Sequence, residues 1–426
     1  MRTKLICSVF ALVICTAFGA NSQPVAVYTF VCNGNTTKGL GSCPNGGNPG
    51  NILIQGSDGN FYGTARVSSF QEGTLPAKGG TIFSLTPGGA FTLLHTFDEG
   101  TGKNFPNGET PVSLMEGPDG NLYGYTTSGG NGYENPNGFF GYGVLFRIGK
   151  TGSGFEVLHR FCSTGVYCND GSYPIGSLLT GSDGNIYGTA FEGGFGNGCC
   201  GRIFRVVPSS GAYQVVFSFT PETGGFPTGL TPGSDGSFYS LSSSGGFLFH
   251  YTPATGALQS TAVSFISGCG GSACFAINWA AGALVFGPNG NLYGLYTIYD
   301  VGGSGVFEVP TSGGSAQLFP EYDTSIPASP VGMLLASDGN FWVTYSGSSA
   351  ATDGNQFGSL ITLSPVDGTV IQTLTPFGGA GGSNPAGVIQ VKDGTLWGEA
   401  SGGAVTGAGK FAGGTVFSLN LGLPPN

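Results

Sequence analysis

Three histidines are the side chains best suited to act as general bases near neutral pH. His95 and His159 each stand two residues before a phenylalanine and occupy the same place in a repeated segment. That place holds Phe217 and Tyr28 in two other copies. A place filled by rings of different chemistry predicts packing. We therefore expect no catalysis from these histidines, nor from His250, which stands alone between aromatic residues.

Carboxylates are the other candidates for acid–base chemistry, and a pair of them can cleave a glycosidic bond. The acids in or beside expected loops are Glu134, Asp170, Glu192, Glu321 and Asp323. Solvated acids also lie in loops, so this position assigns no role. The sequence has no Gly-x-Ser-x-Gly motif, and glycine-rich phosphate motifs are uninformative in so glycine-rich a chain. We name no catalytic residue, metal ligand or cofactor.

The composition indicates which elements carry these residues. Of 426 residues, 82 are glycine and 25 proline, only 8% are charged, and 39% are hydrophobic. Long surface helices need more Lys, Glu, Arg and Leu, whereas abundant Gly, Ser, Thr, Tyr and Phe suit short strands joined by turns. We predict an all-β protein. Its net charge of −10 repels phosphate backbones, which excludes nucleic acid as a partner.

Residues 1–20 have the parts of a secretory signal peptide: a basic start, an apolar run and the small-x-small site Ala-Phe-Gly at 17–19. The run is shorter than the roughly 20 residues of a spanning helix. A lipoprotein site at Cys15 would need a small residue where isoleucine precedes it. We expect a mature chain, residues 21–426, without a membrane span, in the periplasm or outside the cell.

Eight cysteines follow the signal peptide, an even number that suits an oxidising compartment. Near neighbours predict three disulfides: Cys32 with Cys43, Cys162 with Cys168, and Cys269 with Cys274. Zinc would need Cys-x-x-Cys spacing or convergent histidines, so we expect no metal. The adjacent Cys199 and Cys200 leave three alternatives, which are a vicinal disulfide, two free thiols and an intermolecular link.

A turn of the form Asp-Gly-Asn, then an apolar residue, then Tyr or Trp, recurs down the chain. Its seven copies begin at Asp58, Asp119, Asp183, Asp235, Asn289, Asp338 and Asp393. Asp-Gly is a favoured hairpin turn, because glycine accepts positive φ and the Asp side chain binds nearby backbone N–H groups. Calcium would need about six to eight oxygens. We expect scaffold turns, with the Tyr or Trp packed between repeats.

Each repeat has four apolar segments in about 50 residues, as in a β-propeller blade. The last repeat lacks a fourth strand, and residues 25–31 have the pattern of one. We predict a single seven-bladed propeller of four-stranded antiparallel blades, closed by this N-terminal strand. The expected blades are 48–105, 106–173, 174–226, 227–278, 279–326, 327–384 and 385–426 with 25–31.

Three segments of the repeat together resemble a known family. They are Gly-Ser-Asp-Gly-Asn-Phe/Ile-Tyr-Gly-Thr, Gly-Gly-Thr-Ile/Val-Phe-Ser-Leu and Leu-Leu-His-Thr-Phe, and they resemble the GloVer tandem repeat of bacterial secreted "choice-of-anchor" proteins. The resemblance covers nearly the whole mature chain, although Ser240 and Val343 stand where the repeat has glycine. It implies a repeat-built β protein at or beyond the cell envelope, without an assigned activity. We expect no C-terminal anchor. The turn is also similar to those of periplasmic sensor propellers and streptogramin-lyase-like propellers.

In such a ring the Asp-Gly-Asn turns share one face, here called the turn face, with the turns between third and fourth strands. The other connections form the loop face, where segments 65–79 and 127–143 are long and varied. Propellers usually present binding sites on such loops. The binding candidates are Phe70, Glu72, Tyr133, Glu134, Phe139, Phe140 and Tyr142. The alternative is that these loops are glycine-rich spacers.

We therefore expect a non-enzymatic monomer that binds a glycan, a peptide or an envelope protein on its loop face. The alternative is an extracytoplasmic enzyme, such as a polysaccharide or lactone lyase, that uses carboxylates and tyrosines of these loops. A third possibility is a purely structural envelope component. Replacing Glu134 would abolish only an enzymatic activity, whereas removing the rings of Phe139, Phe140 and Tyr142 would abolish binding.

Overall fold

The computed structural model describes most of the chain beyond its first residues. The described residues are 23–35, 40–50, 53–71, 79–97, 105–130, 141–164, 167–195, 199–242, 246–265, 275–277, 284–298, 304–319, 329–347, 357–374, 377–378, 382–402 and 410–426. They form strands and turns and no α-helix, so the all-β prediction is confirmed. The signal peptide expected at 1–20 lies outside the described residues.

The strands follow one another in sets that the repeats predict. They are β1 (Val25–Asn35), β2 (Leu40–Pro49), β3 (Ile54–Gln55), β4 (Phe61–Gln71), β5 (Thr81–Leu85), β6 (Phe91–Thr96), β7 (Glu109–Glu116), β8 (Leu122–Ser128), β9 (Val144–Ile148), β10 (Glu156–Arg160), β11 (Ser172–Thr180), β12 (Ile186–Phe195), β13 (Cys199–Val207), β14 (Ala212–Ser218), β15 (Thr231–Pro232), β16 (Phe238–Leu241), β17 (Phe247–Thr252), β18 (Ala257–Phe265), β19 (Phe275–Ile277), β20 (Val285–Phe286), β21 (Leu292–Ile298), β22 (Ser304–Val309), β23 (Gly314–Leu318), β24 (Pro330–Leu335), β25 (Phe341–Tyr345), β26 (Ser359–Leu363), β27 (Val370–Leu374), β28 (Ser383–Gln390), β29 (Leu396–Gly402) and β30 (Lys410–Leu419).

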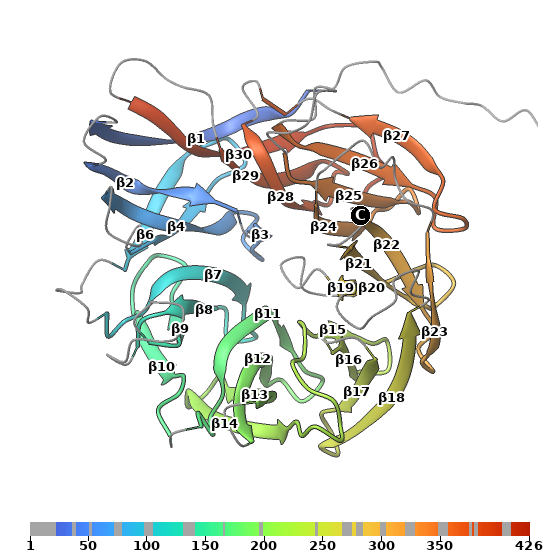
Figure 1. Ribbon diagram of the computed structural model, residues 1–426. Helices are drawn as coiled ribbons and strands as arrows, with labels where there is room; N and C mark the ends of the chain where they lie inside the picture. Colours follow the sequence, from blue (N-terminus) through green and yellow to red (C-terminus); the bar gives the residue numbers. More distant parts are fainter. Residues whose placement is uncertain are drawn as a thin grey trace, which may run out of the picture.

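These strands form a propeller-like ring of sheets around a common centre (Figure 1). Strands β7–β10, β11–β14 and β24–β27 make separate four-stranded antiparallel sheets, and the other strands belong to two nine-stranded sheets. The strand before each Asp-Gly-Asn turn lies innermost, as β7, β11 and β28 show clearly (Figure 1). The propeller-like arrangement of the prediction is confirmed.

The core lies between neighbouring sheets. Tyr62 of β4 packs against Leu114, Leu122 and Phe146 of the next set of strands, and its side chain is fully buried. The equivalent Tyr123, Tyr187 and Tyr293 also pack on the set that follows them. The period-two alternation of the second strands produces this packing, because it sends the Tyr or Trp ring to one side of the strand and the residue that follows, in most repeats a glycine, to the other.

Two strand pairs join what would otherwise be separate sheets. Strand β1 pairs antiparallel with β30, with Ala26 opposite Phe417 and Tyr28 opposite Val416. Strand β2 then pairs with both β1 and β4. Elsewhere β18 and β23, two outer strands, pair in parallel through Val263 and Gly314. The first and last of the described strands are therefore joined by backbone pairing.

Two predicted disulfides are confirmed: Cys32–Cys43 joins β1 to β2, and Cys162–Cys168 lies in the segment between β10 and β11. Cys269 and Cys274 lie outside the described residues. Cys200 is also in a disulfide, so a free thiol there is excluded. Disulfides are typical of extracytoplasmic proteins. Over the part of the chain that is described, no helix is present that could cross a bilayer.

Candidate functional site

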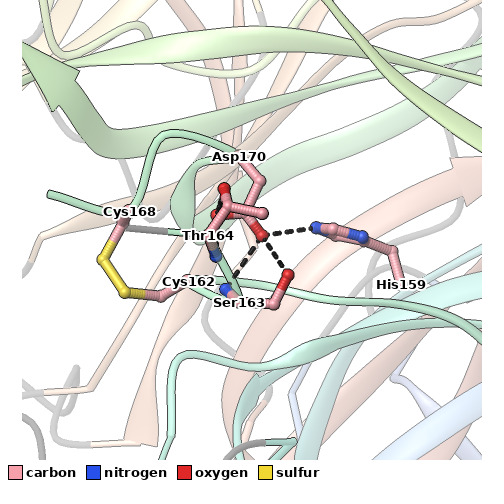
Figure 2. Close-up of a disulfide and its surroundings, with 6 residues drawn as sticks. All are labelled: His159, Cys162, Ser163, Thr164, Cys168 and Asp170. Carbon is pink, nitrogen blue, oxygen red and sulfur yellow. Dashed lines mark hydrogen bonds and ion pairs between the residues drawn. A yellow bond between two sulfur atoms is a disulfide. The ribbon is translucent and has the colours of Figure 1, made fainter. Parts of the chain in front are cut away.

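His159 lies beside the carboxylate of Asp170, and this contact was not predicted from the sequence. Its Nε2 is 3.0 Å from Oδ2 of Asp170, across the segment closed by the Cys162–Cys168 disulfide (Figure 2). Asp170 also accepts hydrogen bonds from the backbone and hydroxyls of Ser163 and Thr164. Burial raises the pKa of Asp170, but the hydrogen bonds from His159, Ser163 and Thr164 lower it by more. The pKa of this carboxyl therefore lies far below its usual range.

The ring of Tyr28, which takes the place of His159 in another repeat, makes the same kind of contact. His159 of β10 stacks on Tyr213 of β14 at a ring distance of 3.6 Å, and Tyr28 of β1 stacks on Phe91 of β6 at 4.2 Å. Tyr28 is also hydrogen-bonded by an amide, Asn45 Nδ2 to Tyr28 Oη at 2.7 Å, in the place of the Asp170 contact. These are outer strands, so the His159–Asp170 pair is a structural tie between neighbouring sheets at the rim.

The other two histidines also stack on aromatic rings. His95 lies 3.8 Å from Phe155 of the next set of strands, with nearly parallel rings. His250 stacks on Tyr239, and its Nε2 is 3.6 Å from Asp235 of an Asp-Gly-Ser turn. All three histidines therefore pack on aromatic rings, as the sequence predicts for the shared position of His95 and His159.

The Asp-Gly-Asn turns form a recurrent hydrogen-bonded unit. Asp119 accepts from the backbone N–H of Asn121, from its amide and from the hydroxyl of Tyr123 at 2.8 Å. Burial and this carboxylate together raise the pKa of Tyr123 to about 12. Asp58, Asp183 and Asp338 bind their own turns in the same manner. The carboxylates are thus occupied by the scaffold.

Neighbouring turns are also connected across the turn face. The carboxylate of Glu116, at the end of β7, accepts from the backbone and hydroxyl of Ser57 at 2.7 and 2.6 Å. Lys150, in the turn between β9 and β10, lies 2.5 Å from the same carboxylate and 3.9 Å from Asp58. Ser337 and Gln390 make the corresponding contact later in the chain. This face is a scaffold of satisfied polar groups.

Most binding candidates of the loop face lie outside the described residues. These are Glu72, Tyr133, Glu134, Phe139 and Phe140, with Glu321 and Asp323 of the loop acids. Phe70 lies in β4 and pairs with Gly41, but its side chain is not described. Tyr142 is described: it is half-buried, and its ring lies 5.2 Å from that of Tyr173 at an angle of 72°.

A ring of left-handed residues lies on the loop face, where the innermost strands begin. Five of the described non-glycine residues that directly precede a proline have φ between 52° and 58°; we call these five the axial collar. They are Asn48, Thr110, Tyr173, Phe226 and Asn384. The residue before a proline ordinarily adopts extended backbone. Asn48 and Asn384 are exposed, and the other three are half-buried.

Contacts between neighbouring sheets hold the collar in this conformation. The backbone N–H of Thr110 donates to the carbonyl of Gly79, and that of Phe226 donates to Cys200. The proline that follows Thr110, Pro111, packs on Gly80 of the preceding sheet. Corresponding glycine–proline contacts are Gly201 with Pro227, Gly358 with Pro385, and Gly414 with Pro49. The left-handed backbone is therefore imposed by the way in which each sheet meets the next.

Aromatic side chains extend the collar over part of its circumference. Phe191 of β12 lies 5.2 Å from Phe226, and Tyr142 lies beside Tyr173. Glu192 follows Phe191 and is half-buried, and burial raises the pKa of its carboxyl. Burial, and then the charge of Glu192, raise the pKa of Tyr142. Rings and one weakly acidic carboxyl thus meet on this part of the loop face.

Glu399 is a second unusual acid. Its side chain is fully buried, and a Cβ at Gly63 would collide with its Oε1. At two equivalent strand positions a threonine hydroxyl donates to backbone carbonyls: Thr189 to Ile175 and Thr228, and Thr344 to Gly332. Two other repeats have leucine at this position, Leu241 and Leu295. A buried carboxylate here differs from both, and Arg66 lies within electrostatic range of it.

One feature of the collar is visible in the sequence. Each member precedes the proline that opens a repeat, as in Gly-Asn-Pro, Glu-Thr-Pro and Ser-Tyr-Pro. The sign of φ before that proline depends on packing between sheets, which is not visible in one repeat.

The fold of this chain is similar to the folds of several solved structures. A catalytically inactive variant of virginiamycin B lyase from Staphylococcus aureus, crystallised with quinupristin, matches 92% of this chain and 99% of its own length at 14% identity, with a TM-score of 0.52. Periplasmic gluconolactonase from Pseudomonas aeruginosa matches over 81% of this chain and 95% of its own at 15% identity, with a TM-score of 0.50. At these identities the likeness concerns the fold, and the class is that of propeller-like β proteins.

The family model of the Gloeobacter/Verrucomicrobia repeat matches residues 73–285, which is half of the chain. The protein belongs to this repeat family, as its sequence resemblance implied. A search of the curated proteins gives no match.

Proposed function

We propose that the mature chain, residues 21–426, is a single seven-bladed ring and acts as a monomer. Two features support seven blades: there are seven turns of the Asp-Gly-Asn type, and each is followed by a strand that pairs with a third one. The pairing of β1 with β30 supplies the last set with a fourth strand. The two disulfides and the basic, apolar start of the sequence support export by a signal peptide at residues 1–20.

We propose further that this ring is a secreted, non-enzymatic protein that binds a ligand or partner on its loop face. The axial collar carries this proposal. Its five side chains are exposed or half-buried around the beginnings of the innermost strands, whereas the carboxylates of the turn face are engaged in the scaffold. Binding sites ordinarily use varied side chains presented by a rigid framework.

The test is an array of glycans, peptides and envelope proteins probed with the purified mature chain. We expect at least one class to bind. Binding should be lost when Phe139, Phe140 and Tyr142 are replaced together by serine, and kept in the turn-face control Lys150→Ala. Loss of binding in Lys150→Ala with retention in the triple variant would overturn the assignment to the loop face.

A second candidate, an extracytoplasmic lyase acting on polysaccharides or lactones, is favoured by one observation. Glu399 is a fully buried carboxylate at a strand position that holds Thr64, Thr189 and Thr344 in three other repeats, within electrostatic range of Arg66. An acid kept in such a place at the cost of desolvation can serve proton transfer. If this candidate is correct, Glu399→Gln abolishes turnover of polysaccharide or lactone substrates while thermal unfolding is retained. Absence of turnover in the unmodified protein rejects it.

A further inference from the structure

The axial collar keeps side chains where glycine would be the easier residue. A left-handed conformation costs a non-glycine residue about 1–2 kcal/mol, and for β-branched or bulky residues such as Thr110, Tyr173 and Phe226 it is an outlier. The chain uses glycine at neighbouring left-handed positions, among them Gly108 and Gly171. Glycine would adopt this backbone conformation without that cost. The presence of side chains at these five positions therefore points to a role for the side chains themselves.

The collar is divided into two arcs of different chemistry. Asn384, Asn48 and Thr110 belong to successive sets of strands and offer amide and hydroxyl groups. Tyr173 and Phe226 belong to the next two sets, and each is extended by a second ring, Tyr142 and Phe191. No member of the collar carries a charge. One side of the same surface thus offers hydrogen bonds and the other offers flat apolar rings.

We infer that the axial collar binds a neutral oligosaccharide chain. This inference rests on the proposed binding function of the loop face and names its ligand. A pyranose ring has one apolar C–H surface that packs on an aromatic ring, and hydroxyls at its edge that exchange hydrogen bonds with amides, hydroxyls and carboxyls. The tyrosine and phenylalanine pairs receive the C–H surfaces, the two asparagines bind the hydroxyls, and Glu192 adds an acceptor beside Tyr142.

A peptide fits this surface less well. Extended peptides gain affinity from main-chain hydrogen bonds to a free sheet edge and from charge complementarity. At the centre of the ring, innermost strands approach one another closely: Gly176 contacts Gly229, and Gly332 contacts Gly387, so a Cβ at the first of each pair would collide with the second. At these contacts the strands are covered by neighbouring backbone. None of the five collar side chains is charged, and burial raises the pKa of Glu192, the carboxyl beside Tyr142.

The experiment measures binding of neutral hexasaccharides to the mature chain by titration calorimetry, with β-1,4-glucose, β-1,4-xylose, β-1,3-glucose and β-1,4-N-acetylglucosamine as probes. The variants are Tyr173→Asn and Phe226→Asn. Asparagine is the residue that the collar itself has at two equivalent positions and that tolerates the left-handed conformation, so folding should be kept. The matched control is Tyr167→Asn, an exposed tyrosine outside the collar, in the segment closed by the Cys162–Cys168 disulfide.

We expect at least one hexasaccharide to bind, and each collar variant to weaken it about tenfold or more, with no change in the control. Saccharide binding that persists in both collar variants would place the ligand elsewhere and overturn the inference. Binding of peptides alone would overturn the ligand class while the proposed function stands. Binding of neither class, on this panel and on the array, would overturn both.

Discussion

A single aspartate organises each turn of this protein. The carboxylate of Asp183 accepts from the backbone of Asn185, from its amide, and from the hydroxyl of Tyr187. The ring of Tyr187 is buried against the next set of strands. One side chain therefore closes a hairpin and orients the residue that joins two sheets, which explains why the turn and the Tyr or Trp recur together.

Replacing Asp183 by alanine should destabilise the protein by about 1–3 kcal/mol, because the Asn185 N–H and the Tyr187 hydroxyl lose their acceptor. The matched control is Asp183→Asn. At Asn289 an asparagine binds the backbone of Asn291 and the hydroxyl of Tyr293, so this variant should lose less than about 1 kcal/mol. Urea unfolding measures both. Equal losses in the two variants would contradict the role assigned to the carboxylate.

The sequence predicted these residues because their geometry is local. Asp, Gly and Tyr of a turn lie within five positions, so the pattern contains the interaction. The His159–Asp170 pair was missed because one member lies in β10 and the other lies beyond Cys168, so they meet only through the path of the chain around the Cys162–Cys168 disulfide. The collar was missed because its φ values follow from the fit of one sheet on the next.

At the scale of elements, proline on glycine is the recurrent contact between sheets. A Cβ at Gly358 would collide with Cδ of Pro385 and lie 2.7 Å from the carbonyl oxygen of Tyr345. Gly339, in a turn of the same sheet, has a similar positive φ but nothing within 4 Å of such a Cβ. Alanine substitutions at these two glycines therefore separate the free-energy cost of a left-handed backbone from the cost of the glycine–proline contact.

Gly358→Ala should cost about 2–4 kcal/mol, since it adds overpacking to backbone strain. Gly339→Ala should cost about 1–2 kcal/mol, from the left-handed backbone alone. The measurement is the free energy of unfolding in urea for both variants. If Gly339→Ala destabilises as much as Gly358→Ala, the glycine–proline contact has no weight of its own.

Strands and their order were predictable because period-two alternation and turn residues determine them locally. The pairing of β18 with β23 was not, since two parallel outer strands from different repeats meet there only through the curvature of the ring. The buried position of Glu399 was likewise not predictable, because the other repeats hold threonine, tyrosine or leucine at this strand position and the pattern therefore does not mark it.

For the molecule as a whole, stability should fall in acid. Asp58, Asp119, Asp170 and Asp183 have lowered pKa values, because hydrogen bonds outweigh the opposing effect of burial. A carboxyl whose folded pKa lies below its unfolded value of about 3.9 stabilises the protein above that pH, and this contribution is lost as pH falls further. Glu192, with a raised pKa, acts oppositely but is a single group.

The urea midpoint should therefore decrease steeply as pH falls below about 4. A series of unfolding curves between pH 7 and pH 2.5 measures it. A midpoint that stays constant or rises between pH 5 and pH 3 would contradict the net effect of these carboxylates. In Asp170→Asn the acid-dependent loss should be smaller, because one of the groups with a depressed pKa has been removed.

The proposed closure of the ring can be tested by removing residues up to Val31, which keeps the Cys32–Cys43 disulfide. Tyr28 and the fully buried Phe30 leave with the strand. Loss of one such phenylalanine costs about 3–5 kcal/mol, so the thermal unfolding temperature should drop. A synthetic peptide of residues 25–31 should restore it, and a scrambled peptide should not. Unchanged stability after the truncation would contradict closure by β1.

The two nine-stranded sheets also bear on how such a ring can change its size by gene duplication. Sheets β7–β10 and β11–β14 share no strand pair and meet through the buried Tyr123, which has counterparts in Tyr62 and Tyr187, so a copied repeat inserted there finds a matching surface. Strand β2, which pairs with β1 and β4, and the β18–β23 pair have no counterparts among the described strands. An insertion at either place would break backbone pairs that a copied repeat cannot replace.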